Sequence, residues 1–138
     1  MSAAPIPQFT VELFEAGTID VDAFDHDAHI YVAWLYLERH ELLEAIQNFT
    51  AALKRLTTQL GIPGKYHETI TWFFMVLIEE RRKESSACDW YAFRRENDDL
   101  FARDEDSILN HYYKHETLGS ERARRSFLLP DRLTDQAS

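Results

Sequence analysis

Apolar residues recur along this chain at spacings of three and four, the period of amphipathic helices rather than of strands. The pattern predicts a short helix at 11–16, a second at about 25–40 and a longer one at about 41–60. Gly17 is expected to end the first helix, and the carboxylate of Asp22 or Asp25 to cap the second. No glycine or proline divides the second helix from the third, so the pattern leaves open whether they are one helix or two.

The clearest break in the chain is the segment Gly61-Ile62-Pro63-Gly64, and a fourth helix is predicted after it at about 66–84. Its middle is apolar nearly all round, because seven consecutive apolar residues run from Trp72 to Ile78. A helix with this pattern is expected at the centre of a fold, covered by the other helices. Phe74 and Leu77 are therefore predicted to be almost fully buried.

Weaker helical patterns follow at about 88–96, 105–116 and 120–127, and no alternating strand pattern of useful length appears. The expected fold is all-α: a compact single-domain bundle of five to seven helices around the central apolar helix at about 66–84. Residues 9–133 are expected to form this domain, with flexible tails at 1–8 and 134–138.

Composition and charge narrow the functional classes. The chain has 138 residues, of which 45% are hydrophobic and 13% aromatic, as in one globular domain. Its net charge is −9, and this acidic balance argues against nucleic-acid binding, which needs a basic face. The longest apolar run falls far short of the roughly 20 residues of a membrane span. With no apolar leader and a single cysteine, Cys88, the sequence predicts a soluble cytoplasmic protein.

Candidate chemistry gathers on the second helix and at the start of the fourth. Histidines and small or aromatic residues follow one helical stripe at offsets of 3, 4, 3 and 4: His26, His29, Ala33, Tyr36 and His40. His67 and Glu68 stand where the fourth helix begins. Two neutral imidazoles and a carboxylate are a common ligand set for iron or zinc. The sequence therefore predicts a divalent metal site with His29 and His67 as ligands, completed by His26 or Glu68.

Two alternatives remain open at this point, and no reaction or enzyme class is assigned. In the first, the same histidines serve as hydrogen-bond partners or general acid and base in a metal-free pocket for a small organic ligand. Three aromatic residues are candidates to line that pocket, although they also fit core positions: Trp34, Tyr36 and Trp72. In the second alternative, the protein is non-catalytic and its apolar helices form a homodimer.

Three segments of the chain resemble a group of small bacterial all-helical proteins. They are Phe24-x-His26-x-x-His29-x-x-x-Ala33-Trp34, then Gly64-Lys65-Tyr66-His67-Glu68-Thr69, and then Ser120-x-x-Ala123-Arg124-x-x-Phe127-x-x-Pro130-Asp131. The resemblance covers most of the chain from about Phe9 and implies that the three segments belong to one domain. It implies no activity and no catalytic residue.

Overall fold

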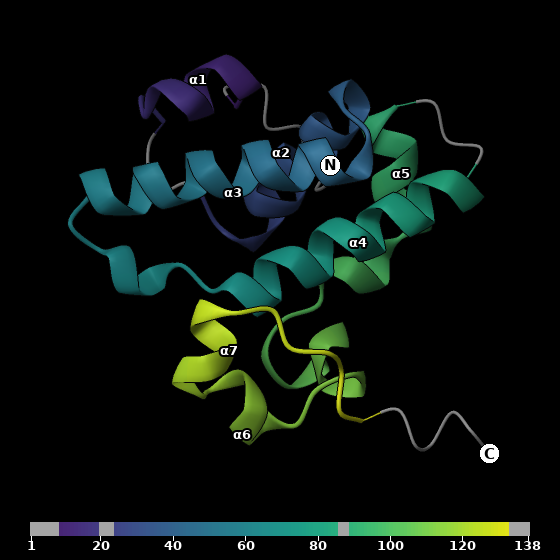
Figure 1. Ribbon diagram of the computed structural model, residues 1–138. Helices are drawn as coiled ribbons and strands as arrows, with labels where there is room; N and C mark the ends of the chain where they lie inside the picture. The colour runs from purple at the N-terminus through teal and green to yellow at the C-terminus, as the bar shows by residue number, and fades with distance from the viewer. Residues whose placement is uncertain (1–8, 20–23, 86–88, 133–138) are drawn as a thin grey trace.

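The computed structural model describes residues 9–19, 24–85 and 89–132 (Figure 1). Within these ranges the chain forms seven α-helices joined by loops and short 3-10 turns, without a strand, which confirms the predicted all-α fold. The tails predicted at 1–8 and 134–138 lie outside the described residues, as do Asp22 and Cys88. None of the helices in these ranges combines the length and the apolar character that crossing a bilayer requires.

The first two helices begin and end at the residues that the sequence indicated. Helix α1 spans Val11–Ala16 and ends at Gly17, whose φ of 73° lies in the left-handed region that favours glycine. Helix α2 spans His26–Arg39. Asp25 caps it, because its Oδ1 accepts a hydrogen bond from the Ala28 amide at 3.0 Å.

The structure also settles whether α2 and the next helix are separate. His40 and Glu41 both have extended backbone, so α2 stops there and α3 runs separately over Leu42–Gln59. Helix α3 carries its buried residues along one stripe, which includes Phe49, Leu53 and Leu56. The two helices therefore pack side by side as a pair, each burying one face.

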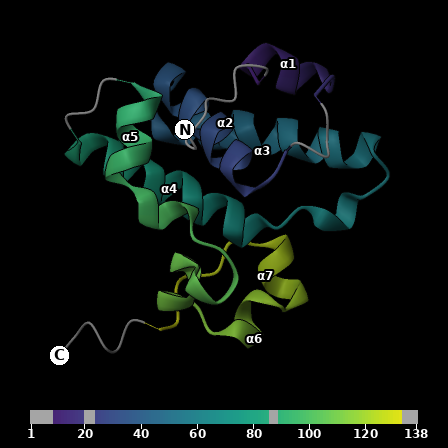
Figure 2. The ribbon, with the colours of Figure 1, turned by 180° about the vertical axis from the view of Figure 1, so that it is seen from behind.

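Helix α4, Glu68–Glu84, lies at the centre of the fold (Figures 1 and 2). Helices α2 and α3 contact it on one side, and α7, Glu121–Arg125, contacts it on the other. Phe74 and Leu77 are 1% and 6% exposed, so their predicted burial is confirmed. Helix α5, Trp90–Glu96, packs Trp90 against Tyr31 of α2 at a ring-centroid distance of 4.9 Å.

The single helical stretch predicted at 105–116 is wrong. The structure places two 3-10 turns there, η4 at Asp104–Asp106 and η5 at Ile108–His111, followed by the one-turn helix α6 at His115–Leu118. A further 3-10 turn, η3 at Asp98–Phe101, precedes this stretch. The Asn110 side-chain amide donates to the carbonyls of Asp104 and Glu105, at 2.9 and 3.1 Å. Such local side-chain bonds compete with the helical hydrogen-bond pattern, and periodicity does not reveal them.

Replacement of Leu77 by alanine tests the central position of α4. The lost burial and the cavity left behind are expected to lower the free energy of unfolding by about 2–5 kcal/mol in chemical denaturation. Val76 is the neighbouring control, since it is 43% exposed. Val76→Ala should change the free energy by no more than about 0.5 kcal/mol, as at ordinary surface positions. Equal effects of the two substitutions would contradict the described packing of α4.

Candidate functional site

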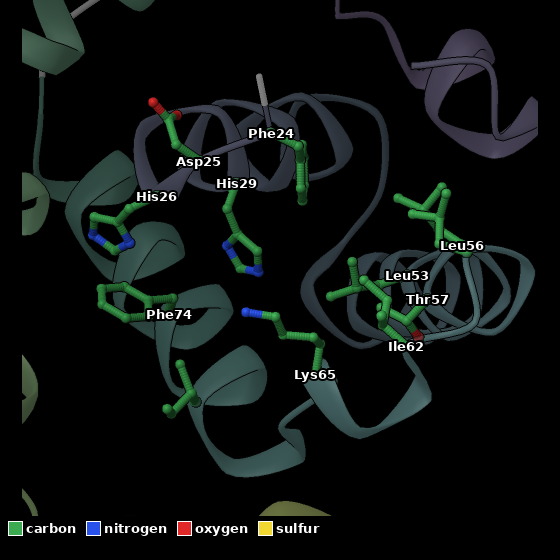
Figure 3. A pocket seen from close by; sticks show the side chains of 12 residues that line it. Phe24, Asp25, His26, His29, Leu53, Leu56, Thr57, Ile62, Lys65 and Phe74 are labelled. Atoms are coloured by element: carbon green, nitrogen blue, oxygen red, sulfur yellow. The ribbon is translucent and has the colours of Figure 1, made fainter. Parts of the chain in front are cut away.

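A cavity of about 360 Å³ opens beside the first turns of α2 and α4 (Figure 3). The end of α3 and the 3-10 turn η2, Pro63–Lys65, close its other sides. Most of its wall is apolar: Phe24, Leu53, Leu56, Leu60, Ile62, Ile70 and Phe74. The remaining lining residues are polar or charged: Asp25, His26, His29, Thr57 and Lys65. A mostly apolar cavity of this size with a few converging polar groups is typical of small-molecule sites.

His29 is a partly buried polar group of this cavity. Its ring packs edge-on against Phe49 at 5.2 Å and against Phe24 at 5.9 Å between centroids. Burial, together with the smaller effect of the neighbouring His26, lowers the pKa of His29 to about 4. The imidazole is therefore neutral at pH 7 and carries one N–H donor and one lone-pair acceptor.

Neither ring nitrogen of His29 forms a hydrogen bond with any described residue. Figure 3 shows the ring extending from α2 into the space between α3 and α4. His29 therefore presents its hydrogen-bonding capacity to whatever occupies the cavity.

His26, one turn earlier on α2, is fixed by the protein. Its Nε2 lies 2.9 Å from the Leu100 carbonyl oxygen, so the neutral ring donates from Nε2 and leaves Nδ1 as an acceptor. The edge of the ring also contacts Phe74, at 5.3 Å between centroids. His26 thus lies between the cavity and the 3-10 turn η3, which carries Leu100.

Lys65 supplies the positive charge of the cavity. It is the last residue of η2, and Figure 3 shows its amino group reaching toward His29. Within the described ranges no carboxylate lies within salt-bridge distance of Lys65. The carboxylate that lines the cavity belongs to Asp25, which already caps α2 and lies 3.7 Å from an Arg103 guanidinium nitrogen.

His67 lies apart from these residues and has a structural role. It caps α4, since its Nδ1 accepts from the Ile70 amide at 3.2 Å, and its Nε2 donates to the Leu118 carbonyl at 2.7 Å. Both ring nitrogens are therefore occupied by the protein. Sequence reasoning did not indicate this cap, because histidine is not among the residues preferred at the N-terminus of a helix.

Glu68 also points away from the cavity. It accepts a hydrogen bond from the Tyr66 hydroxyl at 2.5 Å and lies 3.7 Å from the Lys54 amino group. Of the four predicted metal ligands, only His26 and His29 therefore share the cavity. Across the described ranges, no three histidine, cysteine, aspartate or glutamate side chains are grouped as a metal site. Those residues do not supply a three-ligand set, and the metal centre stays a prediction from the sequence.

The three aromatic candidates for the pocket wall lie elsewhere than in the His29 cavity. Tyr36 is fully buried and donates to Glu15 at 2.8 Å, and burial with this bond raises the pKa of its phenol. Trp34 packs against Trp90 at 5.5 Å, and Trp72 stacks on Phe127 at 5.4 Å. The core alternative considered for these aromatics fits these positions.

Sequence reasoning missed several residues that line the cavity, among them Lys65 and Thr57. Lys65 had one signal, since it directly follows the Gly61–Gly64 break and lies two residues before His67. The leucines of α3 gave no such signal. A leucine that lines a cavity and a leucine in the core recur at the same three- and four-residue spacing along a helix.

No family model, curated protein or solved structure matches this chain. The comparisons therefore assign no role to any residue, and the function has to be argued from the cavity.

The lowered pKa of His29 predicts that acid destabilises the protein. The unfolded state takes up a proton near pH 6.5, whereas folded His29 takes one up only near pH 4. This contribution to stability is complete above pH 6.5 and is lost as the pH falls toward 4, by up to about 3 kcal/mol. In urea denaturation between pH 7.5 and 4.5, His29→Asn should show a weaker pH dependence than wild type.

The exposed His111 provides the control for this titration. His111→Asn should retain the wild-type dependence of stability on pH. If His29→Asn and wild type lost stability in parallel, the neutral, enclosed state described for His29 would be wrong.

Proposed function

We propose that this protein binds a small organic molecule in the His29 cavity and does so without a metal ion. One observation carries the proposal: an imidazole whose two nitrogens form no hydrogen bond with any described residue extends into a mostly apolar cavity. Unpaired polar groups at enclosed positions cost free energy unless water or a ligand satisfies them. A ligand with a polar end and an apolar body fits both parts of the cavity.

The apolar walls of the cavity would supply most of the binding free energy for a ligand, and the polar residues would orient it. Removing apolar surface from water contributes roughly 25 cal/mol per Å², and most of the lining is aliphatic or aromatic. His26 is held in place by Leu100, and His29 by its two aromatic neighbours, so both rings are ordered before a ligand arrives. Pre-ordered groups lower the entropic cost of binding.

Binding fits this site better than general acid–base catalysis. An efficient general base has a pKa near the working pH, whereas the pKa of His29 is about 4. A base this weak removes protons poorly at neutral pH. The site therefore supports ligand recognition, with His29 as a neutral hydrogen-bonding group.

The homodimer alternative stays a prediction from the sequence. Exposed large apolar side chains are present on different elements, such as Leu43 on α3, Val76 on α4 and Leu129 after α7. No contact in the structure indicates which of them a second copy would cover.

A neutral probe, 3-phenylpropionamide, tests the binding proposal. It combines a compact apolar body with a polar amide and carries no charge. Bound only to the folded state, it should stabilise the protein by about 2.7 kcal/mol at a hundred times its Kd. Calorimetric titration and a rise in melting temperature measure this effect.

Two leucines at opposite ends of α3 provide matched variants. Leu60 lines the cavity and Leu43 does not, and they are 41% and 67% exposed, so neither substitution disturbs the core. Leu60→Trp should fill part of the cavity and remove amide binding, whereas Leu43→Trp should leave binding intact. Binding that survives Leu60→Trp would place the probe elsewhere and overturn the proposal.

Metal addition separates this proposal from the metal hypothesis. Iron(II) or zinc(II), added to untagged protein at pH 7.5, should leave the melting temperature unchanged, because His67 is fully occupied and His26 has one free nitrogen. A metal-induced rise that disappears in His29→Asn would instead support a metal centre. Such a rise would also fade toward pH 5.5, since imidazole ligands must be neutral.

A further inference from the structure

We propose that the natural ligand of the His29 cavity is a small monocarboxylate with a compact apolar body, bound with its carboxylate between Lys65 and His29. This inference rests on the proposed function and adds the charge and chemical class of the ligand. It follows from the pairing of charges around the cavity, from the donors that face it and from the apolar character of its walls.

Two charged side chains line the cavity among the described residues, Lys65 and Asp25. No carboxylate of the described ranges lies within salt-bridge distance of Lys65, whereas Asp25 accepts from the Ala28 amide and lies 3.7 Å from Arg103, which also lies 3.3 Å from Asp27. The lining residues from α3 and α4 are uncharged. A ligand that enters this space therefore meets the ammonium group of Lys65, which forms no ion pair with any described carboxylate and favours an anionic group.

The donors that face the cavity suit a carboxylate. The three N–H groups of Lys65 and the single N–H of neutral His29 approach the same space in Figure 3. A carboxylate has two oxygens that accept hydrogen bonds and no donor of its own. Hydrogen bonds to an ionised acceptor are roughly twice as strong as neutral ones.

The walls favour a monoanion over a phosphate. A phosphate monoester carries close to two negative charges at neutral pH and presents three strongly hydrated oxygens. Its binding would require several cations or amide donors, and the cavity offers one lysine among mainly aliphatic and aromatic side chains. A carboxylate needs less compensation and leaves the rest of the ligand free to contact the leucines and phenylalanines.

The overall charge of the protein makes this preference testable. The chain carries a net charge of −9, with nine carboxylates and one arginine in residues 1–48. Its long-range field therefore attracts cations and repels anions. A preference for a carboxylate over an amine of the same shape must come from the cavity itself.

Three probes of nearly identical shape test the inference: 3-phenylpropionate, its neutral amide and 3-phenylpropylamine. Calorimetric titration of the wild-type protein at pH 7.5 and low salt should give the order carboxylate, amide, amine. We expect the carboxylate to bind about tenfold more tightly than the amide, the ratio typical of one charged hydrogen bond. This comparison needs no variant and is independent of folding effects.

Lys65→Met then removes the cation and keeps an apolar side chain of similar length. It should abolish the carboxylate's advantage over the amide without weakening the amide, and Lys65→Arg should retain the advantage. Lys83→Met is the matched control, because Lys83 is an exposed lysine of α4 that does not line the cavity. That variant should bind all three probes as wild type does.

The outcomes separate the two proposals. Equal binding of carboxylate and amide, or a carboxylate preference that persists in Lys65→Met, would overturn the monocarboxylate inference and leave the ligand-binding proposal standing. Failure of all three probes to bind wild-type protein would overturn both.

Discussion

The middle of α4 is apolar nearly all round, and the fold is built to cover most of it, with Val76 left exposed. Burial of Phe73, Phe74 and Met75 removes its middle from water and supplies much of the driving force for folding. The α2–α3 pair covers one side, and the C-terminal segment with α7 covers another (Figure 2). The His29 cavity lies near the first turn of α4, between that helix, the start of α2 and the end of α3.

Hydrogen bonds at the N-terminus of α4 hold the C-terminal segment in place. His67 donates to Leu118, and the Thr69 hydroxyl lies 2.7 Å from the carbonyl oxygens of both Ala123 and Ser126. The Thr69 oxygen also accepts from the Leu128 amide at 3.1 Å. Residues 65–69 therefore have two roles. Lys65 reaches into the cavity, while His67 and Thr69 form hydrogen bonds that hold the C-terminal segment against α4. A substitution in this short segment affects the cavity or the fold, depending on the residue.

The environment that makes the cavity attractive to an apolar ligand also determines the chemistry of His29. Aromatic neighbours and apolar walls disfavour the imidazolium, so the pKa falls to about 4 and the ring stays neutral at physiological pH. The low pKa makes His29 a weak base, and the neutral ring can both donate and accept a hydrogen bond. Charge and hydrogen-bonding geometry are therefore supplied by different residues of the cavity. Lys65 supplies the positive charge, and neutral His29 supplies a directional hydrogen bond.

The sequence by itself determined the helices α1 to α4, the Asp25 cap, the Gly17 stop and the burial of Phe74 and Leu77, because each depends on local spacing or on one residue's chemistry. It also marked His26 and His29 as neighbours on one face of a helix. The tertiary structure decided what that face meets: the leucines of α3 and Lys65, not His67. Spacing along a helix determines which face a side chain lies on. What packs against that face depends on segments that are distant in the sequence. For the same reason, only the folded chain shows that His67 donates a hydrogen bond to the Leu118 carbonyl. It also shows that no described residue forms a hydrogen bond with the ring of His29.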